Sequence, residues 1–408
     1  MPSETRPANR PSGHALLAAI PPRSRRADLD ALRVFGMLAV FVVHVAQIFS
    51  PWQTWHVQNA QRTVWAGQIN LFAWPWLMPL FMLLAGAGAS YSLSHRDNAS
   101  YLGDRTVKLV IPFVLGTILL VPPQIWVERL AEGRAGEGFV RFFPHFFECC
   151  YPDGNLAAGH LWFIAYLWVY AVVSLPLLRF IQSRRGRVWM ARLKRVCGTD
   201  VGVLWLILPI ALGQIALRSR FPQTLTLIDD WANHAVLFVM YVLGFAFAMD
   251  GALLGAIERQ WTRAIGPALV SSCWLAWYAA TTTVPGILPL PRTIPYFAFW
   301  FAFGVANWSW IVALVGLARR LLRGPHHRLE YVSRSLYPFY MVHQTAIVLV
   351  AWLVVGRTGG IVWKAMIVFS AALVVTTAVT ELARRWAPTR VLLGMDSPET
   401  MLDVRAPR

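Results

Sequence analysis

Charged residues are scarce in this chain, and acidic ones are scarcer still. Only 14% of the 408 residues are charged, with 20 Asp and Glu against 37 Lys and Arg, while 57% are hydrophobic and 20 are Trp. Soluble globular domains carry roughly 25% charged residues. The composition therefore excludes an ordinary soluble enzyme and predicts a chain whose main solvent is lipid.

The surplus of basic residues gives a formal net charge of +17, a value that by itself would suit a nucleic-acid-binding protein. Nucleic-acid binders gather their cations on a polar domain or beside stacking aromatic residues. Here the cations lie between apolar runs instead. We therefore interpret the charge as a signal of membrane topology and expect no nucleic-acid partner.

Cysteine is also rare, with four residues at Cys149, Cys150, Cys197 and Cys273. Adjacent cysteines bond to each other only with strain, and these spacings match neither a disulfide framework nor a zinc site. The sequence predicts no redox chemistry, no metal centre and no permanently bound cofactor.

Long apolar runs dominate what remains. A membrane-spanning helix needs roughly 20 mostly apolar residues. The sequence offers ten such runs, at about 31–50, 71–93, 107–127, 160–180, 201–217, 232–249, 264–282, 295–318, 336–356 and 361–382. We predict an all-α, polytopic integral membrane protein. The Phe-rich segment 137–148 predicts a short helix that lies on the outer surface and does not span.

The Lys and Arg residues predict the orientation. Most of the 37 fall on one side of the membrane if the N-terminus is inside, as the positive-inside rule requires. We expect both termini in the cytoplasm, a disordered tail at 1–27, one transmembrane domain at 28–390 and a C-terminal tail at 391–408. The small-residue run 85–90 predicts close helix packing, because it lacks the context of a phosphate-binding loop.

Ionisable residues inside membrane spans are costly, so each is a functional candidate. The first span holds Arg33 and, eleven residues later, His44. Eleven residues make about three helical turns, so the two share one face about 16.5 Å apart along the axis. Arg33 suits a phosphate group and His44 suits proton transfer. Alternatively, Arg33 extends to the interface and His44 bonds a neighbouring helix.

Three further cationic or imidazole side chains belong to the predicted cytoplasmic half. Arg105 and Lys108 lie one turn apart at the start of the third span and would extend an anion site beside Arg33. They also fit plain topology anchors. His343 lies about two turns into the ninth span from the inner side, where it either lines the same cavity or is a structural histidine.

Aromatic residues and histidines mark the predicted outer side. Trp55 and His56 follow the first span, and His160 and Trp162 open the fourth. Flat apolar faces and ring donors of this kind suit binding of a sugar. Trp and His also anchor helices at the membrane interface, which is the alternative interpretation.

Taken together, these motifs resemble the acyltransferase-3 family of bacterial membrane acyltransferases, which modify surface and periplasmic glycans. The resemblance rests on Leu29-Asp30-Ala31-Leu32-Arg33 with a histidine eleven residues on, Arg105-Thr106-Val107-Lys108, His160-Leu161-Trp162-Phe163 and Tyr340-Met341-Val342-His343, and it extends over about residues 27–390. It implies a multi-pass protein of the bacterial inner membrane, an acyl-coenzyme A donor from the cytoplasm, His44 as the catalytic histidine and Arg33 as an aid to donor binding. Lys108 replaces an arginine of the family motif and loses bidentate phosphate contact.

The leading hypothesis is an O-acyltransferase, with His44 as general base, that moves an acyl group such as succinyl or acetyl onto a periplasmic or surface glycan. Arg33, Arg105, Lys108 and His343 are the candidates for donor binding; Trp55, His56, His160 and Trp162 are those for the acceptor. The alternative function is a transporter or flippase for a glycan or lipid-linked sugar. A haem protein is disfavoured because His44 and His343 are expected to approach from opposite sides.

Overall fold

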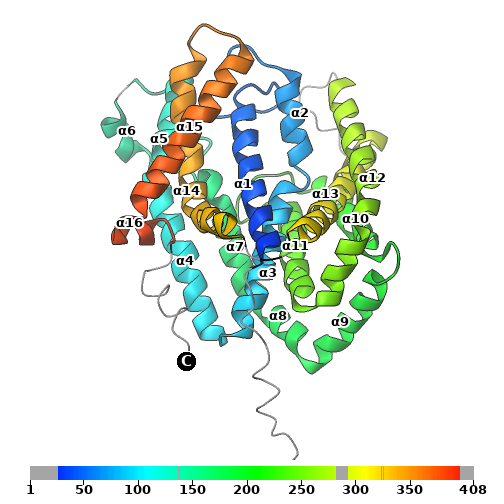
Figure 1. The fold of residues 1–408 in the computed structure, drawn as a ribbon. Coiled ribbons are helices and arrows are strands. Elements are labelled where there is room, and N and C mark those ends of the chain that lie inside the picture. The colour runs from blue at the N-terminus through cyan, green and yellow to red at the C-terminus, as the bar shows by residue number, and fades with distance from the viewer. Residues whose placement is uncertain (1–25, 137, 282–292, 323, 325, 396–408) are drawn as a thin grey trace, which may run out of the picture.

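The computed structural model describes residues 26–136, 138–281, 293–322, 324 and 326–395. These residues form helices and no β-strand, which confirms the all-α prediction (Figure 1). The helices are α1(Ala27–Gln47), α2(Val64–Ala73), α3(Leu77–Ser94), α4(Asn98–Leu119), α5(Pro122–Ala131), α6(Phe139–His145), η1(Gly159–Leu161), α7(Trp162–Val173), α8(Leu175–Gln182), α9(Arg184–Cys197), η2(Gly202–Leu206), α10(Ile207–Arg218), α11(Trp231–Met249), α12(Gly251–Thr281), α13(Ile294–Leu321), α14(His327–Val355), α15(Ile361–Ala383) and α16(Ala387–Leu392). Most of the predicted tails at 1–27 and 391–408 lies outside the described residues.

The described residues contain seven helical segments that are long and apolar enough to cross a membrane, or nine if each of two bent helix pairs counts as one span. The prediction was about ten. The missing one is 264–282, whose described part lies in α12. This helix has 31 residues, so its length suffices, but it is not apolar enough to be counted with the others.

One predicted span, 160–180, is bent where the sequence interrupts the helical hydrogen bonding, and a second bend precedes the predicted span 201–217. α7 and α8 meet at 51°, one residue before Pro176, which cannot donate a backbone hydrogen bond. α9 and the η2–α10 segment meet at 116° across the turn that contains Gly198. A third break, at Trp74-Pro75-Trp76, separates α2 from α3.

Helix α1 lies in the middle of the bundle, with α14 and α15 on one side and α2 and α13 on the other (Figure 1). Its buried residues include Leu32, Met37 and Val40. Phe35, Leu38 and Val42 are exposed on the opposite face. The helix is therefore apolar on both faces, as a membrane span is, with one face packed against protein and the other exposed.

The small-residue run of α3 packs tightly against α11. A Cβ atom on Gly86 would lie 1.8 Å from the carbonyl oxygen of Tyr241, and one on Gly244 would lie 1.9 Å from that of Leu83. The two backbones therefore approach closely enough to exclude any side chain at these positions. This confirms the prediction that the run serves helix packing.

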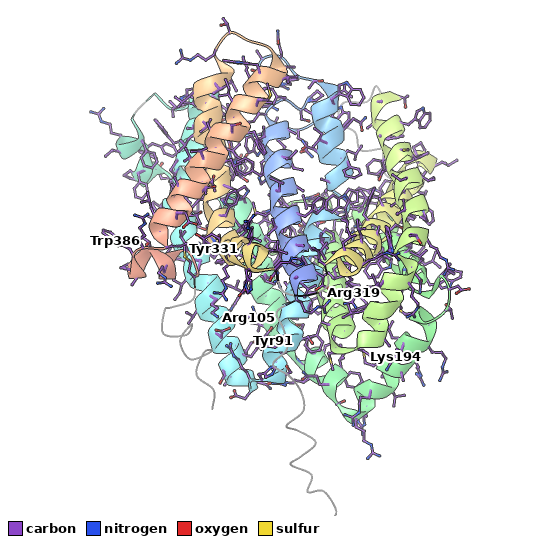
Figure 2. All side chains as sticks on the ribbon, viewed as in Figure 1. Tyr91, Arg105, Lys194, Arg319, Tyr331 and Trp386 are labelled. Carbon is purple, nitrogen blue, oxygen red and sulfur yellow. The ribbon has the colours of Figure 1, made fainter. Side chains whose placement is uncertain are left out.

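Several cations that the positive-inside rule assigns to the cytoplasm gather at one end of the bundle. Figure 2 shows Arg105, Lys194 and Arg319 in the lower half, where α1 begins. Nη1 of Arg319 is 3.5 Å from Oδ2 of Asp28 in the first turn of α1. That these cations lie at one end of the bundle agrees with the predicted topology. That this end faces the cytoplasm stays a prediction.

Candidate active site

Two imidazoles from opposite ends of the sequence meet in the interior. Nδ1 of His44, on α1, lies 3.0 Å from Nε2 of His343, on α14. His343 is completely buried and His44 is half-buried. The expectation that the two approach from opposite sides is wrong, because α1 and α14 pack side by side and bring the rings to the same depth.

The third histidine of the site comes from η1, just before α7. The His160 ring is buried and stands edge-on to His343, with ring centroids 5.2 Å apart. Its Nε2 lies 3.0 Å from the carbonyl oxygen of Met341 and donates to it. Nδ1 of His160 is buried and has no hydrogen-bond partner among the described residues. The site thus joins α1, α14 and the start of α7.

The hydrogen bonds assign the tautomers of the His44–His343 pair. Nδ1 of His343 lies 2.6 Å from the carbonyl oxygen of Tyr340, which can only accept, so this nitrogen carries the proton. A buried imidazole is more stable neutral than charged. Nε2 of His343 therefore accepts from Nδ1–H of His44. His44 keeps a lone pair on Nε2, which has no hydrogen-bond partner in the part of the chain that the structure describes.

Trp55 and His56 border this pair. The Trp55 ring lies almost parallel to the His44 imidazole, with centroids 6.0 Å apart, and fixes its orientation. Both ring nitrogens of His56 are engaged, because Nδ1 pairs with Glu128 of α5 and Nε2 lies 3.0 Å from the side-chain amide nitrogen of Gln344. The His56 side chain can therefore offer a substrate mainly its carbon edge.

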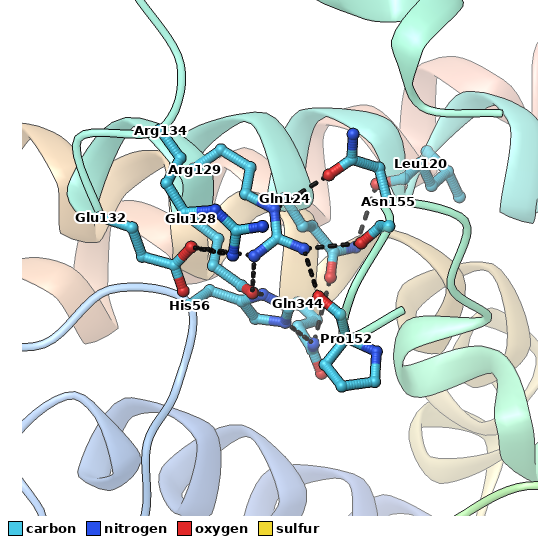
Figure 3. A network of polar contacts seen from close by, with 11 residues as sticks. His56, Leu120, Gln124, Glu128, Arg129, Glu132, Arg134, Pro152, Asn155 and Gln344 are labelled. Carbon is cyan, nitrogen blue, oxygen red and sulfur yellow. Dashed lines mark hydrogen bonds and ion pairs between the residues drawn. The ribbon is translucent and has the colours of Figure 1, made fainter. Parts of the chain in front are cut away.

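The bonds of His56 continue into a polar network between α5 and α14 (Figure 3). The Gln344 amide also donates to Oε1 of Gln124 at 3.1 Å. The Gln124 amide in turn donates to Oγ1 of Thr345 and to the carbonyl oxygen of Leu120. His56, Gln124, Gln344 and Thr345 therefore satisfy one another, as buried polar groups must. The network holds Trp55, the neighbour of His56, against His44.

The same network fixes the loop that follows α6. Arg129 is 4% exposed and donates to Oδ1 of Asn155 and to the carbonyl oxygens of Pro152 and Gly154. Figure 3 shows this guanidinium beside the Glu128–His56 pair. Burial raises the pKa of Tyr151 in this loop, and the Glu128 carboxylate adds to the effect. One buried arginine thus ties the loop to the edge of the histidine site.

The three cations predicted to bind the donor lie nearer the start of α1 and on α4. Nη1 of Arg33 donates to Oδ1 of Asp30 at 2.9 Å. The guanidinium of Arg105 lies over the Tyr101 ring, 5.3 Å from its centroid. Nζ of Lys108 lies 3.1 Å from Oδ1 of Asp104. Each cation thus has an anionic or aromatic neighbour on its own helix.

The structure brings together five of the nine predicted site residues: His44, Trp55, His56, His160 and His343. Trp162, the first residue of α7, lies instead on a separate cavity beside α10 and α11. Sequence reasoning missed Glu128, which falls one residue beyond the predicted third span at 107–127. No local sequence signal marks it, because its burial and its pairing with His56 depend on packing. In the described part of the chain, no group of three potential ligands could hold a metal ion.

Comparison with known proteins identifies the family of the chain that carries this site. Residues 26–384 match the acyltransferase-3 family, whose description is "Acyltransferase domain". The chain belongs to this family. It is therefore a membrane acyltransferase, and the matched residues include α1 through α15, with every histidine of the site. The alternative of a transporter or flippase has no comparable support.

Named relatives give a more specific likeness. The chain is similar to glucans biosynthesis protein C of Escherichia coli K12, with 25% identity over 346 residues that cover 79% of this chain and 82% of the relative. The protein of the same name from E. coli SMS-3-5 is 28% identical over 347 residues, with the same coverage. No solved structure matches the chain significantly.

Proposed function

We propose that this acyltransferase moves an acyl group from acyl-coenzyme A to a hydroxyl of a glycan, with His44 as general base. The observation that carries the proposal is the bonded pair of His44 and His343. It leaves a lone pair on Nε2 of a half-buried histidine that is held in place by a second ring at Nδ1 and by Trp55 across its face. A general base needs such a fixed, unprotonated nitrogen within reach of the hydroxyl.

The reaction needs no covalent enzyme intermediate. Nε2 of His44 takes the proton of the acceptor hydroxyl while its oxygen attacks the thioester carbonyl carbon, and the new ester C–O bond forms. The C–S bond then breaks, and the coenzyme A thiolate that leaves takes this proton from Nε2 of His44. His343 accepts the Nδ1–H of His44 throughout, so the imidazolium that forms midway stays in the orientation that the reaction requires.

The donor is proposed to bind from the cytoplasmic side. Arg33 lies on the same α1 face as His44, about 16.5 Å along the axis, and is one-third exposed. Its guanidinium matches the geometry of a phosphate oxygen pair. Arg105 and Lys108 would add positive charge at the same end. An extended pantetheine arm fits the span between Arg33 and His44.

The acceptor is proposed to be a glucan in the periplasm of a bacterial cell, with the protein in the inner membrane. The name of the relatives, glucans biosynthesis protein C, supports a glucan. Trp55 stacks on His44, and His160 stands edge-on to His343. Both residues belong to the predicted outer side, which suits an acceptor that arrives from outside. Succinyl and acetyl groups are the candidates for the transferred acyl.

The experiment that tests this proposal compares the glycans of cells that carry different versions of the protein. We expect wild-type cells to carry acylated periplasmic glucans. His44→Ala cells should contain at least 100-fold less acylated glucan, since general base catalysis contributes about 10²–10⁴ in rate. The measurement is mass spectrometry of isolated glucans. His95→Ala, which changes an exposed histidine outside the site, is the matched control. Acylation retained in His44→Ala cells at equal protein levels would reject the role.

A further inference from the structure

A second buried polar cluster lies at the end of α10, away from the histidine pair. Arg218 is 6% exposed and Asp230 is fully buried. Nε of Arg218 donates to Oε1 of Gln214 at 2.9 Å, and its Nη2 pairs with Oδ1 of Asn233. Asn233 in turn donates to Oδ2 of Asp230 at 2.8 Å, as does the hydroxyl of Tyr166 at 2.7 Å. One asparagine thus bridges a buried cation and a buried anion.

Two polar atoms of this cluster, and a third on α13, are buried without a partner among the described residues. They are Nη1 of Arg218, Oδ1 of Asp230 and Oδ1 of Asn307. Asn307 is fully buried in α13, and its side-chain amide nitrogen donates to the carbonyl oxygen of Pro75. Buried polar atoms left without hydrogen bonds destabilise a fold. Of these three residues, Asn307 lines a cavity, so its unpaired acceptor points to a polar group that binds there.

A narrow cavity lies beside this cluster and shares Gln214 and Asn233 with it. Its volume is about 40 Å³, and its walls include Trp74, Trp162, Gln214, Gln223, Asn233 and Asn307. A lining that combines indoles with side-chain amides matches the two surfaces of a sugar, whose C–H face is apolar and whose rim is lined with hydroxyls. At about 10–15 Å³ per buried water, the space admits a hydroxymethyl group rather than a whole sugar ring.

The lining of the cavity selects for a neutral ligand. None of the described residues that line it is charged, so a bound carboxylate or phosphate would have no counter-charge in a low-dielectric interior. A hydroxyl group both donates and accepts. It can therefore donate to Oδ1 of Asn307, which lines the cavity and has no partner among the described residues.

We propose that this cavity is a subsite for the acceptor, which binds a hydroxymethyl arm of a neutral sugar. The inference rests on the proposed function, because it names a binding site for the same glycan. The chain links the two sites directly, since Trp162 in the cavity wall follows His160 by two residues. At the mouth, Nε1 of Trp74 donates to Oε1 of the exposed Gln223 at 3.0 Å, and this bond must open to admit the sugar.

The first test fills the cavity. Val236 of α11 is buried and lines it, whereas Val239 on the same helix is 43% exposed. We expect Val236→Phe to raise the KM for a glucose oligomer at least tenfold in reconstituted membranes, with the KM for acyl-coenzyme A unchanged. Val239→Phe, the matched control, should leave both constants at the wild-type values. A well-folded Val236→Phe protein with the wild-type acceptor KM would overturn the subsite.

The second test needs neither a variant nor turnover. A glucose trimer that carries a diazirine on its hydroxymethyl carbon is photolysed with the wild-type protein, and labelled peptides are mapped by mass spectrometry. We expect labels in the segments 74–79 and 214–237. Labelling confined to the loop around Trp55 and His56 would overturn the subsite even if acyl transfer is confirmed. Labels at the cavity in a protein that transfers no acyl group would support the subsite and reject the proposed function.

Discussion

His44 and His343 differ in what their ring nitrogens contact, and the roles proposed for them follow from this difference. Nδ1 of His343 contacts a carbonyl oxygen and Nε2 of His343 contacts the His44 ring, so both nitrogens of His343 are occupied. His44 has one nitrogen left over. The sequence predicted His44 as the base from its depth and its spacing to Arg33, but it could not pair two residues 299 positions apart, because that contact depends on how α1 packs against α14.

At the same scale, replacing His343 tests whether it acts by accepting the Nδ1–H of His44. His343→Gln keeps a side-chain oxygen that can accept this proton, whereas His343→Leu leaves a buried donor unpaired. We expect His343→Leu to lower kcat about 100-fold and His343→Gln to lower it much less. Steady-state kinetics in proteoliposomes measure both. Equal losses in the two variants would mean that His343 serves packing alone.

At the scale of helices, the sequence predicted some features of the packing and missed others. The run 85–90 predicted a close helix contact, and the α3–α11 crossing confirms it. The partner helix could not be predicted, since small residues indicate closeness and not what lies opposite. The bend at α7–α8, inside the predicted span 160–180, was also not predicted, although Pro176 stands beside it. An apolar run shows that a helix can span, but not that it stays straight.

This crossing gives a prediction for the element scale. Gly86→Ala should destabilise the protein by about 1–3 kcal/mol, because overpacking a tight contact forces the helices apart. Gly88→Ala is the matched control, since a Cβ there meets only Nη2 of Arg33 at 3.9 Å. It should stabilise α3 by up to about 1 kcal/mol. Thermal unfolding in detergent compares the two. A Gly86→Ala protein as stable as Gly88→Ala would contradict the close α3–α11 contact.

For the whole molecule, apolar runs and motif order predicted an all-α membrane protein of the acyltransferase-3 family, and the structure and the family match confirm both. The polar interior was not predictable. Asp230 and Arg218 stand in or beside a predicted outer loop, yet both are buried. Glu128 pairs with His56 across 72 residues. Such groups become visible only when the fold closes over them, because burial is a property of packing and not of local sequence.

The central claim is that His44 catalyses transfer from a donor on one side of the membrane to an acceptor on the other. The most direct measurement uses proteoliposomes of uniform orientation, with a glucose oligomer sealed inside and radiolabelled acyl-coenzyme A added outside, where α1 begins. We expect labelled oligomer in the lumen, no labelled protein, and no transfer by His44→Gln. Transfer by His44→Gln at the wild-type rate, or transfer only when donor and acceptor share one compartment, would contradict the account.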